Sequence, residues 1–157
     1  MKIDFKEEGA NGRYLRAGLH LFSTRGYESV SVRDIAAESG ASVAALYRHF
    51  ESKEAMALYL FRYILSRYEE GLREIAHHET SAVEKLIAFQ DYTYRFYAED
   101  PDSVRFGLLS QHHFWDEVED ELKPHFWLRN VLGEGMERGE IQKKPVYLWI
   151  TLYTGLL

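Results

Sequence analysis

The sequence contains no cysteine and no long apolar run. Without cysteine, disulfide bonds, thiolate metal sites and cysteine nucleophiles are excluded, and the composition is compatible with a reducing cytoplasm. No segment is apolar for long enough to span a bilayer, and the start, Met-Lys-Ile-Asp-Phe-Lys-Glu-Glu, lacks the hydrophobic stretch of a signal peptide. We therefore expect a cytoplasmic protein without a membrane partner.

Sequence motifs of common enzymes are missing as well. The chain has no Gly-x-Ser-x-Gly elbow, no P-loop and no Gly-x-Gly-x-x-Gly turn. No internal repeat or low-complexity segment is visible. We expect a protein that is not an enzyme and that needs no cofactor.

Negative charge is concentrated in the C-terminal part of the chain. The net charge of −6 argues against a nucleic-acid partner, because affinity for DNA comes largely from neutralising phosphates. However, Asn11 to Lys53 holds six basic residues against four acidic ones, whereas Met56 to Leu157 holds 11 basic and 17 acidic residues. The acidity therefore belongs mainly to a part that need not touch DNA.

The length and the aromatic content allow a sizeable core. A chain of 157 residues buries about two-thirds of the surface that it exposes when unfolded, which suits one domain or a small domain fused to a medium one. The 3 Trp, 11 Tyr and 9 Phe residues can fill a core or line a cavity for an apolar compound.

Residues 31–50 have the pattern of two short helices joined by a tight turn. Ser31 and Asp34 form a capping-box-like start for the first helix. Gly40 suits its end, because glycine adopts the left-handed conformation freely. Ser42 then caps the second helix. This is the pattern of a helix-turn-helix, although any hairpin of two helices in a helical protein offers the same spacing.

The second helix has one packing face and one face of mainly small residues. Val43, Leu46 and Phe50 share the packing face. The residues that lie mostly on the other face are Ala44, Ala45, Tyr47 and Arg48. Alanines allow the backbone to approach base edges, and arginine donates bidentately to guanine.

A longer set of motifs is more specific than the spacing alone. It consists of Leu19-His-Leu-Phe22, Gly26-Tyr27, Ser31-Val-Arg-Asp-Ile-Ala36, Gly40-Ala-Ser42, Leu46-Tyr-Arg-His-Phe50 and Ser52-Lys-Glu-Ala55. Over residues 11–59 the chain closely resembles the N-terminal domain of TetR-family transcriptional repressors. The resemblance implies an all-α homodimeric repressor that binds a palindromic double-stranded DNA operator and is released by a small effector, which it does not name. The leading hypothesis, given the aromatic content, is a lipophilic or aromatic effector.

The resemblance also implies which residues contact DNA. Arg33 matches a residue that touches a base or a nearby phosphate, and Tyr47, His49 and Lys53 match phosphate contacts. The full implied set is Ser31, Arg33, Ser42, Val43, Ala45, Tyr47, Arg48, His49 and Lys53. Val43 and Ala44 carry no side-chain donor, so direct readout would depend on the two arginines and on apolar contact with thymine methyl groups. Because Val43 also lies near the packing face, its role stays open.

The periodicity and the resemblance together predict the domain organisation. We expect a helix-turn-helix domain over residues 1–52, preceded by a frayed arm (1–9), and a helical effector-binding and dimerisation domain over 53–157. The expected helices outside the helix-turn-helix are 11–25, 53 to about 77, 83–97, 101–110, 124–136 and a last one from about 145. Apolar residues surround nearly the whole circumference of 83–97, which predicts the buried centre of the second domain.

The sequence ends inside an apolar run. In the family, two C-terminal helices from each subunit form the dimer interface, and here the first is short and the second is absent. Either the sequence is truncated, or this member dimerises differently. We expect a homodimer through C-terminal helices.

The aromatic residues have two interpretations. The first is plain core packing, and the second is that a subset lines an effector pocket, with Tyr92 and His113 as polar contacts. The candidate lining residues are Phe61, Tyr68, Phe89, Tyr92, Phe96, Phe106, His113, Trp127 and Trp149.

Two other functions remain open. A helical metal-dependent enzyme or metal-binding bundle would use Glu74, His77, His112 and His113, although only one Glu-x-x-His motif is present where a di-iron bundle needs two. A helical adaptor without DNA or ligand would show no salt-dependent DNA binding.

Overall fold

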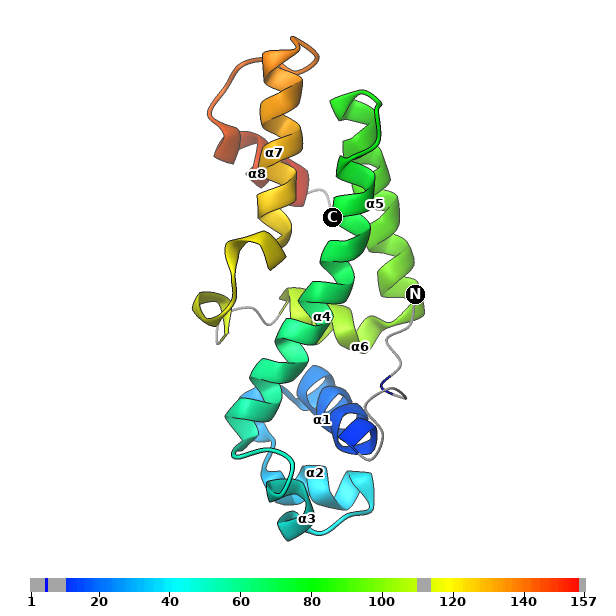
Figure 1. The fold of residues 1–157 in the computed structure, drawn as a ribbon, viewed down its shortest axis with the longest axis vertical. Helices are drawn as coiled ribbons and strands as arrows, with labels where there is room; N and C mark the ends of the chain where they lie inside the picture. Colours follow the sequence, from blue (N-terminus) through cyan, green and yellow to red (C-terminus); the bar gives the residue numbers. More distant parts are fainter. Residues whose placement is uncertain (1–4, 6–10, 110–113, 156–157) are drawn as a thin grey trace. The chain divides into compact units, whose positions relative to one another are not determined.

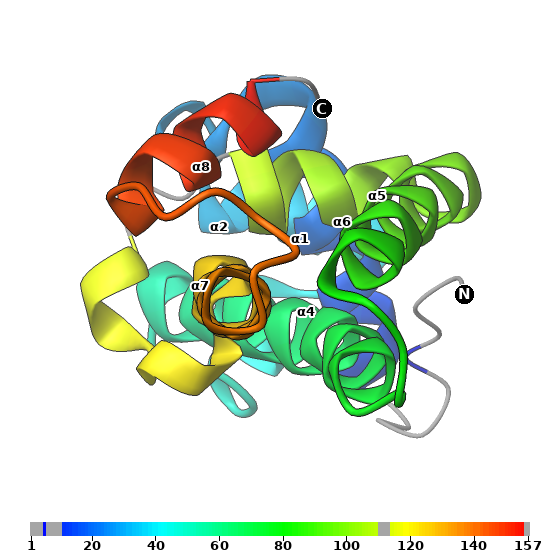
Figure 2. The same cartoon turned by 90° about the horizontal axis from the view of Figure 1, so that it is seen from above.

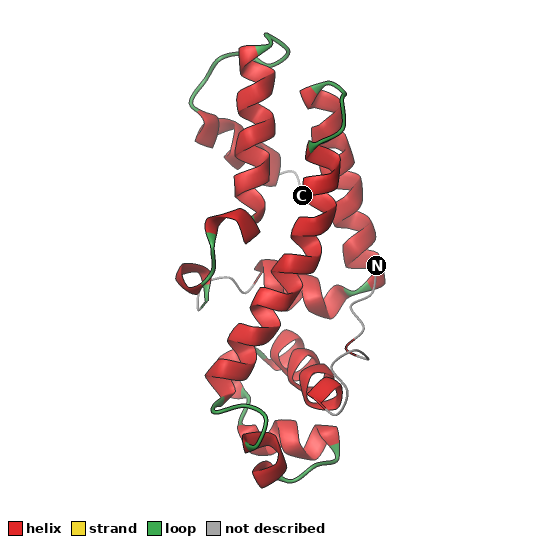
Figure 3. Cartoon of the chain, viewed as in Figure 1, coloured by secondary structure: helices red, strands yellow, loops and turns green. Residues whose placement is uncertain are grey.

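The computed structural model describes residues 5, 11–109 and 114–155, and this part is helical without a strand (Figure 3). The α-helices are α1 (Asn11–Arg25), α2 (Val32–Ser39), α3 (Val43–Tyr47), α4 (Lys53–Ala76), α5 (Ala82–Glu99), α6 (Pro101–Val104), α7 (Pro124–Glu137) and α8 (Val146–Thr154) (Figure 1). Short 3-10 turns are η2 (Tyr27–Ser29), η5 (Trp115–Glu117) and η6 (Asp120–Leu122), and η3 (Arg105–Leu109) is a π-helix. The expected all-α class is confirmed.

The chain divides into two compact units. Unit 1 comprises Met1–Ile64 and Tyr97–Glu117, and unit 2 comprises Leu65–Phe96 and Val118–Leu157. The sequence predicts a domain boundary between residues 52 and 53. In the structure α4 starts within unit 1, and α6 and η3 belong to the same unit as the helix-turn-helix. A functional division at residue 52 stays a prediction.

Unit 1 is built around α1 and the first half of α4. Leu15, Phe22 and Phe61 are at most 1% exposed. The two helices pack closely at Gly18, where a Cβ atom would lie 2.5 Å from Cε of Met56 and the end of the Met56 side chain would have to move. The hydrophobic core thus fixes α1 against α4, which holds the helix-turn-helix in place.

The segment after α5 ends in a π-helix where one α-helix was expected. Asp100 caps α6 by accepting a hydrogen bond from the N–H of Ser103 (3.2 Å), and Pro101 occupies the first helical position. The α-helix ends at Val104, and η3 continues as a π-helix to Leu109. The wider turn places Phe106 against Phe22, with ring centroids 5.4 Å apart. The end of the expected helix at residue 110 lies outside the described residues.

In unit 2 the second half of α4 lies beside α5 (Figures 1 and 2). The Tyr68 ring stacks on Tyr92 (5.3 Å), and its hydroxyl is 2.5 Å from the hydroxyl of Thr93. Lys85 of α5, only 4% exposed, donates to a carboxylate oxygen of Glu134 on α7 (3.1 Å). This ion pair and the aromatic stack tie α5 to its two neighbours.

The prediction that α5 is buried all round is wrong. Phe89 and Phe96 are buried, but Val83, Ile87 and Tyr94 are 46%, 56% and 47% exposed. The reason is that the helices in contact with α5, namely α4, α7 and α8, leave these three side chains about half exposed. On α8, Tyr147, Leu148 and Leu152 are 66%, 48% and 52% exposed. We call these six exposed side chains the apolar face of unit 2. No helix in the described part of the chain has the length and hydropathy needed to cross a membrane.

Candidate nucleic-acid interface

The helix-turn-helix begins at a complete capping box. The Ser31 hydroxyl accepts a hydrogen bond from the N–H of Asp34 (3.2 Å), and the Asp34 carboxylate accepts one from the N–H of Ser31 (2.8 Å). The same carboxylate accepts a bond from the Ser31 hydroxyl (2.5 Å). These bonds hold the pKa of Asp34 below its ordinary value, with the hydroxyl as the largest cause. The charged carboxylate thus fixes the first turn of α2.

The turn between α2 and α3 depends on one glycine. Gly40 has φ +67° and ψ +29°, in the left-handed region, and the N–H of Ala41 donates to the carbonyl of Ala36 (2.9 Å). A residue with a Cβ atom is strained in this conformation. The turn therefore sets the direction in which α3 leaves α2.

The third helix is short and is held by its cap and one core residue. The Ser42 hydroxyl accepts a hydrogen bond from the N–H of Ala45 (3.1 Å). Leu46 is fully buried, and Val43 and Phe50 are half-buried. The packing face predicted from the sequence is thus directed to the protein.

The opposite side of α3 carries exposed side chains. Ala44 and Arg48 are exposed, and Tyr47 is 50% exposed, whereas Ala45 is half-buried. We call Ala44, Tyr47 and Arg48 the outer surface of α3. A small residue about one helical turn before an aromatic hydroxyl and a guanidinium suits approach to base edges and phosphates.

The other residues of the implied DNA-contacting set have different surroundings. Arg33 is exposed on the first turn of α2. His49 is exposed, and its ring lies 5.4 Å from that of Tyr14 on α1. The hydroxyls of Ser31 and Ser42 are committed to capping. Contacts with DNA by these residues stay predictions.

Lys53 directs its ammonium group to the protein itself. Its Nζ donates to the carbonyls of Tyr27 (2.9 Å) and Val30 (3.0 Å) and lies 4.0 Å from the centroid of the Tyr27 ring. The resemblance to TetR-family repressors implies a phosphate contact for Lys53. No local sequence pattern indicates these partners, because they are 26 and 23 residues away along the chain.

The aromatic residues proposed to line an effector pocket do not form one group. Phe61 and Phe106 belong to the core of unit 1, whereas Tyr68, Phe89, Tyr92 and Phe96 belong to unit 2. Burial raises the pKa of Tyr68 and of Tyr92 to about 12, so both phenols are neutral at ordinary pH. Trp127 donates to the carbonyl of Glu121 (3.1 Å), and its ring lies 5.8 Å from that of His77. His113 lies outside the described residues.

A hollow of about 380 Å³ lies in unit 2 between α5, α7 and α8. It is lined mainly by apolar side chains, with Val83, Leu86, Leu132, Glu140, Ile141, Gln142, Trp149, Leu152 and Tyr153 around it. Among the predicted lining residues that the structure describes, only Trp149 lines this hollow. Its rim is fixed by Trp149, which donates to the carbonyl of Gln142 (3.0 Å), and by Tyr153, which donates to that of Leu86 (2.8 Å). Apolar spacing predicted the helices but not this junction.

The residues proposed for a metal site receive no support as a group. Glu74 is exposed, and His77 Nδ1 is 2.7 Å from the carbonyl of Arg73. His112 and His113 lie outside the described residues. Across residues 11–109 and 114–155, no three His, Asp or Glu side chains come together in a group that suits a metal ion.

Known proteins match both the helix-turn-helix and the longer chain. Residues 15–60 match the family model described as bacterial regulatory proteins, tetR family. The chain is 41% identical over 59 residues to the uncharacterised HTH-type transcriptional regulator YwcC of Bacillus subtilis, a match covering 38% of this chain and 26% of that protein. It is 30% identical over 138 residues to the HTH-type transcriptional repressor KstR2 of Mycobacterium tuberculosis, covering 82% of this chain and 67% of that repressor.

The fold is also similar to solved structures. The transcriptional regulator FadR from Bacillus subtilis, in complex with stearoyl-CoA, superposes with a TM-score of 0.74 at 22% sequence identity. The superposition covers 91% of this chain and 80% of that one. At this identity the likeness concerns the fold, an N-terminal helix-turn-helix followed by a helical C-terminal part.

Proposed function

Because the chain belongs to the TetR family of bacterial regulatory proteins, we propose that it is a DNA-binding transcriptional regulator. It binds a palindromic operator as a homodimer, acts as a repressor, and is released by a small lipophilic or aromatic effector. Its place of action is the cytoplasm, where operator DNA lies.

The observation that carries this proposal is the exposed outer surface of α3. A recognition helix must present small and donor side chains outward while its other face packs on the protein. Ala44 and Arg48 are exposed while Leu46 is fully buried. Direct base readout rests on Arg48 and on Arg33, which donate to guanine, and on methyl contact from Ala44.

A second copy of the chain follows from the operator symmetry. Helix-turn-helix proteins bind two half-sites about one helical turn of DNA apart, so two copies of the helix-turn-helix must be joined. The apolar face of unit 2 supports this assembly, because its six large apolar side chains are 46–66% exposed and exposed apolar surface commonly marks an interface. Unit 2 thus joins the two copies, and unit 1 contacts DNA.

The effector binds in unit 2. Its mainly apolar hollow of about 380 Å³ suits an acyl chain or an aromatic compound. A relative of the same fold has been solved with stearoyl-CoA, which supports the lipophilic class. Release requires the effector to bind the state that leaves DNA more tightly than the bound state, since equal affinity shifts no equilibrium.

The proposal is tested first at Arg48. The unaltered protein is used to enrich a duplex from a random-sequence pool, and affinity for that duplex is measured by fluorescence anisotropy. Arg48→Ala is expected to weaken binding by about 10- to 100-fold, because one bidentate base contact is worth about 1–3 kcal/mol. Discrimination between the selected duplex and an unrelated one should fall as well.

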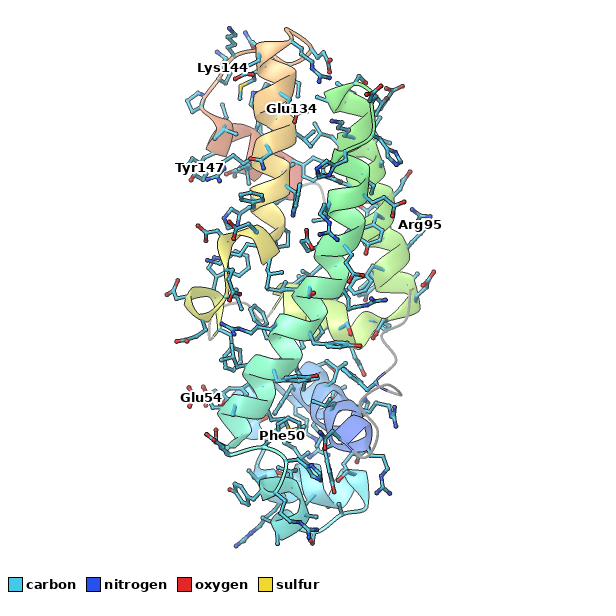
Figure 4. All side chains as sticks on the ribbon, in the orientation of Figure 1. Phe50, Glu54, Arg95, Glu134, Lys144 and Tyr147 are labelled. Carbon is cyan, nitrogen blue, oxygen red and sulfur yellow. The ribbon has the colours of Figure 1, made fainter. Side chains whose placement is uncertain are left out.

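Arg95→Ala is the matched control. Arg95 is exposed on α5 and points away from the helices (Figure 4), so its substitution removes the same charge without touching the helix-turn-helix. It should leave affinity unchanged. Enrichment of no duplex by the unaltered protein, or full specific binding by Arg48→Ala, would contradict the proposal.

A further inference from the structure

Lys53 stands at the first position of α4, is half-buried, and directs its charge to the protein. Two backbone carbonyls and the face of the Tyr27 ring surround its Nζ atom. The carbonyls belong to η2 and to Val30, the residue before the cap of α2. The ammonium therefore links the start of α4 directly to the start of α2.

The charge of Lys53 is at an unfavourable end of its own helix. A cation at a helix N-terminus is opposed by the macrodipole, which favours anions there. The two carbonyl oxygens and the negative ring face compensate for this position. These contacts form within the protein itself, so Lys53 has a structural role in the absence of a ligand.

The linked elements are themselves well fixed. Val30 is 2% exposed, and Lys53 supplies a donor to its carbonyl, which a buried backbone group needs. The Tyr27 ring packs edge-on against Phe22 (5.5 Å) and Phe114 (5.2 Å) in the core of unit 1. Movement of α4 relative to η2 would thus pull on the first turn of α2.

We propose that Lys53 is a positioning residue, which fixes the start of α2 to the start of α4 through the carbonyls of Tyr27 and Val30 and makes no phosphate contact of its own. The inference rests on the proposed DNA-binding function and deepens it. In this role Lys53 orients the helix-turn-helix and does not neutralise the charge of a DNA phosphate.

Salt dependence separates the two roles. A lysine that neutralises a phosphate releases a counterion, so its loss lowers the slope of log affinity against log salt by about 0.9. A positioning lysine lowers affinity at every salt concentration and leaves the slope unchanged. The discriminating measurement is therefore the slope and not the affinity at one salt concentration.

The experiment uses the full chain with Lys53→Met, which keeps the length of the side chain without its charge. Affinity for the duplex enriched by the unaltered protein is measured over a series of salt concentrations. We expect a loss of about tenfold or more with an unchanged slope. Lys144→Met, at an exposed lysine of unit 2 (Figure 4), removes the same charge and should change neither quantity.

A measurement on the unaltered side chain covers the case in which Lys53→Met does not fold. Nitrogen-15 NMR of lysine ammonium groups detects those whose protons are held in hydrogen bonds. The Lys53 signal is assigned by its absence from Lys53→Arg. We expect a protected ammonium in free protein that keeps its chemical shift when the enriched duplex is added.

Each outcome bears on the proposal. A slope reduced by about 0.9, full affinity in Lys53→Met, or an ammonium signal that moves on addition of the duplex would overturn the positioning role while leaving DNA binding intact. If the unaltered protein enriches no duplex, DNA binding itself fails, and the positioning role fails with it.

Discussion

At the scale of single residues, the helix-turn-helix depends on polar side chains that satisfy backbone groups. Ser31, Asp34 and Ser42 each bind N–H groups at a helix start, and Lys53 binds two carbonyls. The first N–H groups and the last C=O groups of a helix need outside partners, because they have none within the helix. The orientation of the reading helix is therefore set by hydrogen bonds as well as by apolar packing.

Removal of the Asp34 carboxylate should destabilise the protein in a pH-dependent way. The pKa of Asp34 is lowered in the folded state, so its contribution is present above the unfolded pKa, about 3.9, and is lost as pH falls through the folded pKa. Asp34→Asn should thus be less stable than the unaltered protein at pH 7. The difference should shrink below about pH 4, as measured by urea unfolding.

Glu38→Gln provides the comparison for Asp34→Asn. Glu38 is exposed on the same helix and takes no part in the capping box. Its substitution should leave stability near that of the unaltered protein. If the free energy of unfolding instead differed between Asp34→Asn and the unaltered protein by the same amount down to acid pH, that result would show that the carboxylate charge does not stabilise α2.

The sequence predicted the local contacts of these residues and missed the distant ones. The capping box joins residues three positions apart, and its pattern is legible in the sequence as Ser31-x-x-Asp34. The partners of Lys53 come from another turn of the chain, 23 and 26 positions away. The family resemblance implied a phosphate contact for Lys53, whereas the structure shows the direction of its ammonium group.

At the scale of elements, the turn between α2 and α3 is the most constrained joint. Gly40 must keep φ +67° so that Ala41 can donate to Ala36. A Cβ atom at Gly40 would meet no neighbour within 4 Å. Backbone strain, not steric overlap, is therefore the cost of a larger residue there.

Gly40→Ala should lower stability by about 1–2 kcal/mol, because an L-residue in the left-handed region costs roughly that amount. Affinity for the selected duplex should fall with it, since α3 leaves the turn in a different direction. Urea unfolding and fluorescence anisotropy measure the two effects.

Gly133→Ala is the matched glycine. Gly133 lies within α7, with helical φ and no neighbour within 4 Å of an added Cβ atom. Alanine should be neutral or stabilise by about 0.5–1 kcal/mol there. Equal effects of the two substitutions would contradict a special role for the left-handed turn.

Helix types and bounds were predictable, but the surroundings of the helices were not. Periodicity located α1, α4 and α7 within one or two residues. It also predicted full burial of α5, whereas Ile87 is 56% exposed. Apolar spacing shows which faces avoid water but not which neighbours cover them. For the same reason the aromatic residues divide between two cores instead of lining one pocket.

At the scale of the whole molecule, charge and apolar surface are divided between different parts of the chain. Basic residues outnumber acidic ones over residues 11–53, and acidic ones dominate after residue 56. Such a division directs the basic part to the DNA. The apolar face of unit 2 is then free to join two copies of the chain.

Leu148→Glu should shift the protein from dimer to monomer. Leu148 is 48% exposed beside Tyr147, which projects from α8 (Figure 4), so the substitution adds a charge to an apolar surface without opening a core. Burial of that charge at an interface would cost several kcal/mol, enough to shift a dimer equilibrium. Analytical ultracentrifugation over a concentration series measures the shift.

The same variant should weaken DNA binding although its helix-turn-helix is untouched. Two linked reading heads bind a palindrome with a high effective concentration for the second half-site, and separate copies lose this gain. Asn130→Glu, at an exposed polar position of α7, adds the same charge elsewhere in unit 2 and should keep both the dimer and the affinity. If Leu148→Glu remained dimeric with full affinity, α8 would lie outside the interface, and the two copies would have to meet through another surface.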